Sequence, residues 1–381
     1  MRRYSARAMS DLLRGASEVQ LGIALVGPGT VGSALLEQLR VESPRLHQRY
    51  GIDLRVMGIT NSREMLLSRD HHPLDLSRWQ DALLEEGTDA SLGVLTEHLK
   101  AAQVAHRCVI DCTASDFLPR FYPRWLEQGI HLVTPNKRLN SGRYAAYAAV
   151  KGLQRSHRAH YMYEGTVGAG LPIIATLKSL LDTGDQIERV EGVFSGTMSY
   201  IFNELRPGVP FSEVVSGAKR RGFTEPDPRE DLSGMDVTRK VVTVARECGS
   251  TAELSDVDTE SLVPPALRGA DISVQTFMEQ LSKFDGDIDA RVREADAAGE
   301  VLRYVGSFDA ESGVCQAHLR RYPKSHPFAN LTGTENIISF TTMRYANPPL
   351  IIRGPGAGPA VTAAGVFADI VTLCRYLGAP S

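Results

Sequence analysis

Residues 21–32 read Leu-Gly-Ile-Ala-Leu-Val-Gly-Pro-Gly-Thr-Val-Gly, and this stretch decides the fold. Its first six residues form an apolar run that is typical of a buried strand, and its last six match the pattern GxGxxG. An amphipathic stretch follows over about residues 31–46, so we expect the chain to run from a strand through a tight turn into a helix.

The three glycines of this turn have separate roles in a dinucleotide site. Gly27 allows the tight turn, Gly29 allows a pyrophosphate to approach the backbone, and Gly32 allows the helix to pack closely on the strand. The amino end of the helix then faces the phosphate charge. A glycine-rich loop without a ligand is the alternative interpretation, and the complete strand, turn and helix favour the cofactor.

Strands and helices alternate along the first part of the chain. Strand-like runs are expected at residues 52–60, 108–113, 131–134 and 159–163, and helical patterns at 121–128 and 143–154. This alternation predicts an α/β fold with a Rossmann-type, doubly wound parallel sheet.

The pattern changes beyond Gly170, where a second domain of α+β character is expected. Its helical stretches are 172–181, 236–248 and 273–298, and its strand candidates are 187–194, 301–308 and 337–340. A strand at 349–353, a glycine turn and a helix at 361–377 then predict a return to the first domain. We therefore expect a flexible N-terminal tail at 1–20, a dinucleotide-binding domain at 21–165 and 350–381, and a second domain at 166–349.

Composition excludes several classes of protein. The chain has 381 residues, 43% of them hydrophobic, which is enough for two domains with full cores. Its 42 Lys and Arg against 45 Asp and Glu leave a net charge of −3 without a basic run, so nucleic acid and anionic membranes are not expected as partners. No apolar stretch approaches the roughly 18 residues of a membrane span, and no secretory signal is recognised. We expect a cytoplasmic protein.

Two further features of the composition leave alternatives open. The five cysteines are scattered and are expected to be reduced. The first ten residues carry Arg2, Arg3 and Arg7 and no acid, as a targeting segment does, but a short tail is the favoured interpretation.

The tip of the second expected strand bears on the choice of cofactor. A site selective for NAD places Asp or Glu there to bind the ribose hydroxyls. Residues 59–63 instead read Ile-Thr-Asn-Ser-Arg, which places Arg63 where it can meet a 2′-phosphate. NADP is therefore favoured over NAD, and a solvated surface arginine is the alternative.

The chain has only eight lysines, so the position of each is informative. Lys137 follows the strand at 131–134, at the expected carboxyl end of the parallel sheet where open α/β folds bind ligands. Lys240 lies four residues after Asp236, so a helix there would place the two side chains on one face. A lysine held near a carboxylate can act as the general acid or base in alcohol dehydrogenation, although most such pairs are surface ion pairs.

The loop at 222–231 contains two prolines that fix an extended turn, and four carboxylates occur within seven residues, namely Glu225, Asp227, Glu230 and Asp231. Their mutual repulsion is costly unless a cation such as an amino-acid ammonium group is recruited. The alternative is a solvated acidic turn in which Asp231 or Ser233 caps the next helix.

Residues 163–172 read Tyr-Glu-Gly-Thr-Val-Gly-Ala-Gly-Leu-Pro, a segment whose glycines expose backbone carbonyls beside one carboxylate. Such oxygens suit a hard monovalent cation, and a tight crossing between domains explains the glycines equally well.

Nearly the whole chain, from Ile23 to Leu377, resembles homoserine dehydrogenase, and in particular the dehydrogenase half of the fused aspartate kinase–homoserine dehydrogenases. The motifs that carry this resemblance are VIDCTAS (109–115), VTPNK (133–137), VGAGLPII (167–174), FSGTMSYIFNEL (194–205), GFTEPDPREDLSGMDVTRK (222–240) and GPGAGPAVTAAGVFADI (354–370). The resemblance implies reversible, NADP- or NAD-dependent interconversion of L-homoserine and L-aspartate 4-semialdehyde, in threonine and methionine biosynthesis.

The resemblance also implies roles for particular residues. The catalytic set is Lys240 as proton donor, Asp236 and Lys137, and the substrate contacts are Glu225, Asp236, Gly222, Asp231 and Thr197. The cofactor contacts are Gly27, Gly29, Thr30, Val31, Gly32, Asn61, Arg63, Thr113, Ser115, Lys137, Gly356 and Gly358. Glu164, with the carbonyls of Val167, Ala169 and Leu171, matches a site for sodium or a similar ion. The second domain is expected to bind substrate and to form a homodimer.

Two alternatives to an active homoserine dehydrogenase follow from the same residues. One is a dinucleotide-binding sensor without turnover, which would keep the glycine turn and tolerate loss of the lysines. The other is an aspartate-semialdehyde dehydrogenase with a cysteine nucleophile, for which Cys112, at the end of a buried strand, is a poor candidate.

Overall fold

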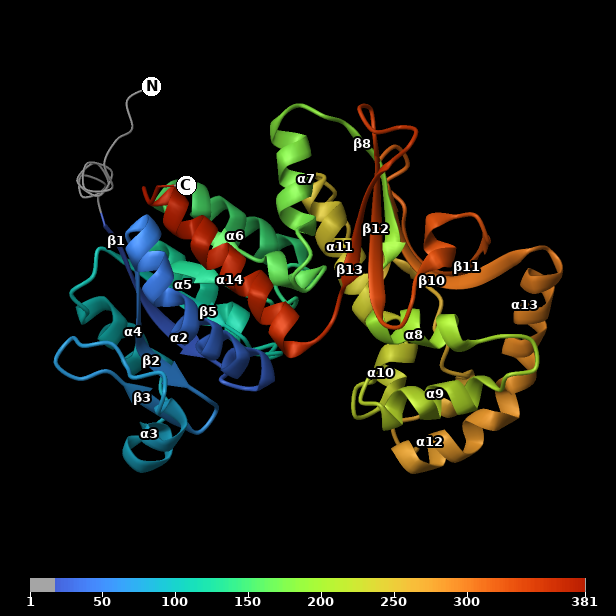
Figure 1. Ribbon diagram of the computed structural model, residues 1–381, viewed down its shortest axis with the longest axis horizontal. Coiled ribbons are helices and arrows are strands. Elements are labelled where there is room, and N and C mark those ends of the chain that lie inside the picture. The colour runs from blue at the N-terminus through green and yellow to red at the C-terminus, as the bar shows by residue number, and fades with distance from the viewer. Residues whose placement is uncertain (1–17, 381) are drawn as a thin grey trace, which may run out of the picture. The chain divides into compact units, whose positions relative to one another are not determined.

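The computed structural model describes residues 18–380 and divides the chain into two compact units. The first unit comprises the chain up to Arg138, residues 148–165 and the chain from Thr362 onward. The second comprises Leu139–Tyr147 and Thr166–Val361. Each unit is built around its own sheet (Figure 1).

Seven strands form the sheet of the first unit, in the order β4-β3-β2-β1-β5-β6-β7. Five neighbouring strands of this sheet, β2, β1, β5, β6 and β7, are parallel. The short strands β3 and β4 extend the edge beside β2, and each pairs antiparallel with its neighbour. The bounds are β1 Val19–Val26, β2 Ile52–Thr60, β3 Glu64–Leu67, β4 Thr88–Asp89, β5 His106–Asp111, β6 His131–Val133 and β7 Tyr161–Met162. The predicted doubly wound sheet is confirmed, and its strand order reverses beside β1, where such sheets bind ligands.

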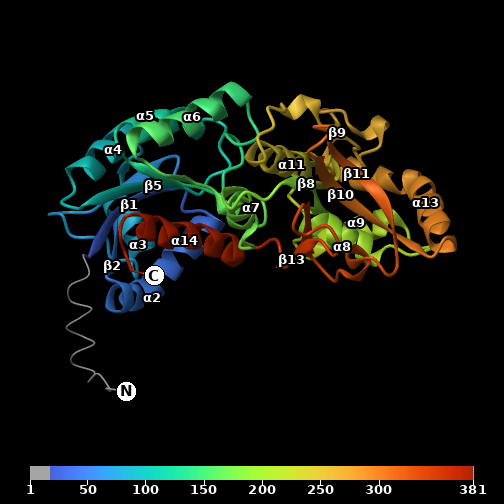
Figure 2. The ribbon, with the colours of Figure 1, turned by 90° about the horizontal axis from the view of Figure 1, so that it is seen from above.

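Helices cover both faces of this sheet. Figure 2 shows α4 and α5 on one side of the sheet and α2 and α14 on the other. The bounds are α2 Thr30–Tyr50, α3 Trp79–Glu86, α4 Leu92–Ala101, the 3₁₀ turn η1 Leu118–Phe121, α5 Tyr122–Glu127, α6 Tyr144–His157 and α14 Pro359–Tyr376.

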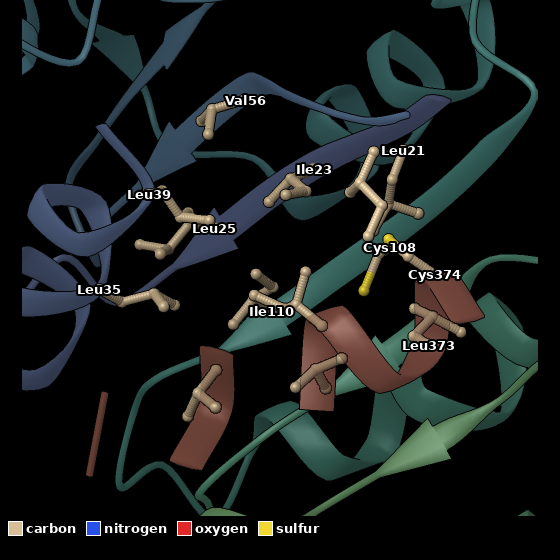
Figure 3. Packing of buried hydrophobic residues seen from close by; sticks show 14 of the residues in the cluster. Leu21, Ile23, Leu25, Leu35, Leu39, Val56, Cys108, Ile110, Leu373 and Cys374 are labelled. Carbon is tan, nitrogen blue, oxygen red and sulfur yellow. The ribbon is translucent and has the colours of Figure 1, made fainter. Parts of the chain in front are cut away.

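The core of the first unit lies between β1, β5 and the helices α2 and α14. Leu21, Ile23 and Leu25 of β1 are fully buried and share one cluster with Leu35 of α2 and Leu373 of α14 (Figure 3). Alternate residues of β1 point to this face because side chains along a strand alternate. The C-terminal helix therefore completes the first unit, in agreement with the expected return of the helix at 361–377 to the first domain.

The sheet of the second unit has six strands, in the order β13-β12-β8-β10-β11-β9. All neighbours pair antiparallel except β11 and β9. The strands are β8 Ile187–Val193, β9 Asp258–Thr259, β10 Glu300–Asp309, β11 Cys315–Pro323, β12 Glu335–Thr342 and β13 Leu350–Pro355. The α+β character expected of this domain is confirmed.

The helices of the second unit include the one that carries the candidate catalytic lysine. They are α7 Ile173–Asp182, α8 Gly196–Glu204, α9 Phe211–Arg220, α10 Pro228–Leu232, α11 Met235–Glu247, α12 Val274–Gln280 and α13 Asp285–Ala297. Helix α11 packs so closely on β10 that a Cβ at Gly306 would lie 2.5 Å from Val241 Cγ2. The absence of a side chain at Gly306 therefore sets how near the helix lies to the sheet.

Three expectations from the sequence differ from the structure. The helical stretch 273–298 is two helices, α12 and α13, separated by a 3₁₀ turn at Leu281–Phe284. The expected boundary at residue 350 is wrong because β13 pairs with β12 in the second sheet. Within the expected tail at 1–20, Val19 and Gln20 are already in β1, and residues 1–17 lie outside the described residues.

No helix within residues 18–380 is both long enough and apolar enough to cross a membrane.

Three histidines lie together at the amino ends of the parallel neighbours β5, β6 and β7. His106 begins β5, His131 begins β6 and His160 directly precedes β7. The ring of His131 lies 6.0 Å from that of His106 and 5.4 Å from that of His160, centroid to centroid. His131 is 3% exposed, and its Nδ1 accepts a 3.0 Å hydrogen bond from the backbone N–H of His160. Burial, together with the charges of His160 and His106, lowers the pKa of His131 to about 3.

This cluster predicts loss of stability in acid. The unfolded chain protonates His131 near its ordinary pKa of about 6.5, whereas the folded chain resists protonation, so the free energy of unfolding falls as the pH drops below about 6.5. We expect His131→Asn, which keeps an acceptor at the Nδ1 position, to weaken this pH dependence in urea unfolding between pH 7 and 5. The exposed His72→Asn is the matched control. An equal pH dependence in both variants would contradict the prediction.

Candidate active site

The glycine turn between β1 and α2 has the geometry that its sequence predicts. Gly27 has a φ of 87°, which favours glycine, and a Cβ at Gly32 would lie 2.2 Å from the carbonyl oxygen of Gly27. A Cβ at Gly29 would meet no atom within 4 Å. The first and third glycines are therefore required by the fold, and the second borders open space at the amino end of α2.

A cavity of about 820 Å³ opens beside this turn. Its polar wall comes from the ends of β1, β2 and β5 and includes Gly27, Gly29, Asn61, Thr113 and Ser115. Its apolar wall comes from α3, α4 and η1 and consists of Trp79, Leu83, Leu84, Leu92, Phe117 and Leu118. The sequence analysis missed this apolar wall. Leu84 is 78% exposed and Phe117 is 54% exposed, so these apolar side chains are accessible to a flat apolar group of a ligand in the cavity.

The tip of β2 carries no carboxylate. Asn61 turns its Oδ1 back onto the chain, where it accepts hydrogen bonds from the backbone N–H groups of Arg63 (2.7 Å) and Glu64 (2.8 Å). Arg63 is exposed and is not among the residues that line the cavity. Thr30 and Val31 begin α2, where backbone N–H groups are available to an anion.

A buried carboxylate organises the loops that follow β5 and β6. Asp111 is 0% exposed, and its Oδ1 accepts hydrogen bonds from the N–H (2.8 Å) and Oγ1 (2.7 Å) of Thr113. Its Oδ2 accepts from the Tyr122 hydroxyl (2.5 Å) and from Asn136 Nδ2 (3.0 Å). Burial raises the pKa of Asp111, and the hydrogen bonds from Tyr122, Thr113 and Asn136 oppose that rise.

Asn136 extends this network to both sides of Lys137. Its Nδ2 also donates to the carbonyl of Ser115 (3.0 Å), and its Oδ1 accepts from the backbone N–H of Arg138 (2.9 Å). The structure therefore brings Thr113, Ser115 and the backbone around Lys137 together through one carboxylate. Sequence reasoning missed Asp111 and Asn136, although both lie inside the quoted motifs.

The cysteine alternative is disfavoured by the surroundings of Cys112. Burial raises the pKa of its thiol, and the neighbouring charge of Asp111 raises it further. A cysteine nucleophile requires the thiolate, which an electropositive site favours and this site does not.

The second unit holds a separate group of predicted site residues. Asp236 and Lys240 both lie on α11, and Lys240 Nζ is 2.7 Å from Asp236 Oδ2, as the spacing of four predicts. Lys240 is 7% exposed, and its Nζ also donates a 2.7 Å hydrogen bond to the carbonyl oxygen of Phe194. This pair is not an ordinary surface pair, because the lysine is buried and oriented by a backbone carbonyl.

The acidic loop divides into two parts. Asp227 caps α10 and forms a 2.6 Å ion pair with Arg229, so its charge is already compensated. The alternative expectation that Asp231 or Ser233 caps the next helix is wrong, because Gly234, with a φ of 75°, is the N-cap of α11. The expected cluster of four uncompensated carboxylates is therefore wrong, because Asp227 is already paired with Arg229.

Asp231 lies close to the lysine pair. The pKa of Asp231 is raised to about 6, chiefly by burial. Hydrogen bonds from the Glu225 N–H (2.8 Å) and from Thr197 oppose this rise, and repulsion from Glu225 and Asp236 adds to it. Thr197 donates a 2.5 Å hydrogen bond from its Oγ1 to the carbonyl of Phe223, which follows Gly222. The second unit thus brings the predicted substrate residues together beside α11.

The remaining predicted residues lie in two glycine-rich segments. Gly356 and Gly358 lie between β13 and α14 in the second unit, and Gly358 has a φ of 117°. Of the predicted cation ligands, Glu164 belongs to the first unit and is 6% exposed, whereas Val167, Ala169 and Leu171 belong to the second. Residues 18–380 contain no cluster of three or more His, Cys, Asp or Glu side chains suited to a metal ion.

Family models match nearly all of the two units. Residues 27–164 match the model described as "Homoserine dehydrogenase, NAD binding domain", and residues 172–371 match the model described as "Homoserine dehydrogenase".

Two curated relatives show how far the sequence likeness extends. The chain is 52% identical over 366 residues to the bifunctional aspartokinase/homoserine dehydrogenase 2 of Arabidopsis thaliana, with 96% of this chain and 40% of the relative covered. It is 40% identical to the homoserine dehydrogenase of Saccharomyces cerevisiae, with 94% of this chain and 99% of the relative covered. The chain thus spans about 40% of the length of the bifunctional plant relatives and nearly all of the yeast one.

Solved structures share the fold and, in one case, a substantial part of the sequence. A Candida auris protein described as of unknown function superposes with a TM-score of 0.87 at 36% identity, covering 95% of this chain and 99% of that one. A hyperthermophilic archaeal homoserine dehydrogenase in complex with NADPH has a TM-score of 0.71 at 22% identity, covering 94% and 98%. Because both family models match in succession and the yeast relative aligns from end to end, the chain belongs to the homoserine dehydrogenase family.

Proposed function

We propose that the protein catalyses the reversible, NADP- or NAD-dependent interconversion of L-homoserine and L-aspartate 4-semialdehyde, in threonine and methionine biosynthesis. The observation that carries the proposal is the ion pair of the buried Lys240 with Asp236, in which the lysine amine is also held by the Phe194 carbonyl. The family membership agrees with it. A nicotinamide cofactor, when bound, supplies the hydride acceptor or donor that the protein itself lacks.

Lys240 is proposed as the proton-transfer group. Oxidation of a primary alcohol requires removal of the hydroxyl proton, and reduction of the aldehyde requires its return to the same oxygen. The Nζ of Lys240 can take or supply that proton, and Asp236 and the Phe194 carbonyl oxygen fix its direction. Lys137, whose flanking backbone is held through Asn136, is proposed to contact substrate and cofactor.

The carboxylates around α11 are proposed to bind the amino-acid part of the substrate. Glu225, Asp231 and Asp236 lie near one another, since repulsion from Glu225 and Asp236 contributes to the raised pKa of Asp231. A substrate ammonium group placed among them would relieve this repulsion. Gly222 and Thr197 are assigned to the same subsite, because Thr197 bonds to the carbonyl of the residue after Gly222.

Replacement of Lys240 tests the assignment. Methionine has a similar length and no charge, so we expect Lys240→Met to fold while kcat with L-aspartate 4-semialdehyde and NADPH falls by about 10²–10⁴, the typical contribution of general acid or base catalysis. NADPH affinity, followed by fluorescence titration, should change little. The exposed Lys283→Met is the control. Undiminished turnover in Lys240→Met would remove the assignment, and tight NADPH binding without turnover in the unmodified protein would favour the sensor alternative.

The cofactor is proposed to be NADP in preference to NAD. The absence of a carboxylate from residues 59–63 and the position of Arg63 at that turn support this preference, as does the NADPH bound to the archaeal protein of the same fold. Trp79 and Leu83 of the apolar wall are proposed to cover the adenine ring.

Cofactor preference is measured as kcat/KM with NADPH and with NADH side by side. We expect NADPH to be preferred and Arg63→Ser to lower that preference by roughly tenfold or more, because a hydrogen bond to a charged group contributes about 1.5–3 kcal/mol. Arg49→Ser, at an exposed site of the same unit, should leave the ratio unchanged. A ratio unaffected by Arg63→Ser would make Arg63 a solvated surface residue.

A monovalent cation, sodium in the first instance, is proposed to bind Glu164 and the carbonyls of Val167, Ala169 and Leu171. The burial of the Glu164 side chain and the left-handed backbone of Ala169 (φ 55°) between two glycines support it, because this backbone can turn carbonyls out of regular structure.

Thermal unfolding tests the cation site independently of activity. We expect sodium chloride to raise the unfolding midpoint more than choline chloride at equal ionic strength, because an ion that binds only the folded state stabilises that state. Glu164→Gln should abolish the difference. An equal response to both salts in the unmodified protein would exclude a sodium site.

The protein is also proposed to be a cytoplasmic homodimer that associates through the sheet of the second unit. Strand β13 lies at the edge of that sheet, and its residues 350–352 are only partly buried. An unpaired strand edge is a site of association. Sedimentation should then give twice the chain mass of 41.6 kDa.

A further inference from the structure

Asn336 is a buried amide that shares an acceptor with the candidate catalytic lysine. It lies in β12 and is 0% exposed. Its Nδ2 donates to the carbonyl oxygen of Phe194 (3.0 Å), the same oxygen that accepts Lys240 Nζ at 2.7 Å. A second, longer hydrogen bond of 3.4 Å runs from Nδ2 to the carbonyl oxygen of Gly356.

The strand register explains why these groups meet. Strand β12 pairs antiparallel with β8, so that Ile337 lies opposite Val193 and the next residues outward, Asn336 and Phe194, come together where β8 ends. Strand β12 also pairs with β13, and Asn336 lies opposite Gly354, two residues before Gly356. Asn336 therefore connects the carbonyl that holds the lysine to the glycine turn at 354–358.

Gly356 is packed directly on this amide. A Cβ at Gly356 would lie 2.0 Å from both Cγ and Nδ2 of Asn336, so no other residue fits there unless the amide moves. Close approach, and not a left-handed backbone, explains the glycine at this position.

The amide is held only on its donor side. Asn336 Oδ1 is buried and accepts no hydrogen bond from any residue of the described chain. An unpartnered buried oxygen destabilises a folded protein, whereas the two hydrogen bonds from Nδ2 stabilise it by satisfying the carbonyl oxygens of Phe194 and Gly356. A role in packing alone therefore does not account for an asparagine here.

We propose that Asn336 is a positioning residue that orients the Phe194 carbonyl oxygen, and through it Lys240 Nζ, and that couples the lysine to the glycine turn at 354–358. The inference rests on the proposed function, because it assumes that Lys240 transfers the proton. Asn336 acts through the carbonyl and does not touch the reacting atoms.

The amide also affects the electrostatics of the lysine. The amide N–H and the lysine amine are both donors to one oxygen, and their positive ends repel each other. When the amide donor is removed, the Phe194 carbonyl oxygen accepts only from Lys240, and the protonated form of the lysine is favoured. Asp236 on α11 lies 2.7 Å from Lys240 Nζ, and Asp231 and Glu225 lie beyond it; replacement of Asn336 changes none of these three residues.

Asn336→Leu separates positioning from packing. We expect this variant to fold with an unfolding midpoint close to that of the unmodified protein, because removal of the unpartnered oxygen offsets the loss of the Nδ2 hydrogen bonds. We expect it to lose kcat by roughly tenfold to a hundredfold because the amine is misplaced. KM for L-aspartate 4-semialdehyde should change less than kcat. The pH–rate midpoint for homoserine oxidation should move upward by about half a unit or more, and further in Asn336→Asp, because a carboxylate favours the ammonium form more strongly.

Gly356→Ala provides a second route to the same displacement, since its methyl group must move the amide. We expect a similar fall in kcat, and the double variant with Asn336→Leu should lose less than the product of the single losses. Unchanged kcat in Asn336→Leu would overturn the proposal. So would a lowered unfolding midpoint together with an unmoved pH–rate profile in both Asn336 variants. If the unmodified protein shows no turnover of L-aspartate 4-semialdehyde, the proposed function itself is wrong. That result is distinguishable from the two results above, which concern only the Asn336 variants.

Discussion

A charged side chain can be buried only where other groups replace the hydrogen bonds of water, and each of the two units contains such a side chain. In the first unit Asp111 accepts four hydrogen bonds within the turns that follow β5 and β6. In the second, the Lys240 amine is held by Asp236 and by the carbonyl that follows β8. Loss of either set of partners would leave an uncompensated charge, so the geometry of the loops is tightly determined.

In both units, glycines lie where two elements pack too closely for a side chain to fit between them. Gly27 and Gly32 let α2 meet the end of β1, and Gly306 lets α11 meet β10. Gly356 lets a turn lie directly on Asn336. In each case the missing side chain brings a helix, a strand or a turn near enough to present polar groups to the candidate site. The spacing between elements is therefore set largely by where side chains are absent.

Much of the fold was predictable because it depends on local patterns. The strand at 52–60 and the helices near 122–127, 173–182 and 235–247 lie within a few residues of their predicted bounds. The short strands β3, β4 and β9 were not predicted, because two to four residues carry too little periodicity. The helical pattern at 273–298 continues through a 3₁₀ turn that packing inserts and that sequence periodicity does not reveal.

The sequence by itself determined the dinucleotide-binding turn, the alternation that leads to a parallel sheet, and the pairing of Asp236 with Lys240, since each depends on residues a few positions apart. Only the tertiary structure decided that β13 joins the second sheet, that Asp227 is compensated while Asp231 is buried, and that Asn336 meets Phe194 across 142 residues. Such contacts depend on strand register and on which surfaces pack together, and no short stretch of sequence specifies these alone.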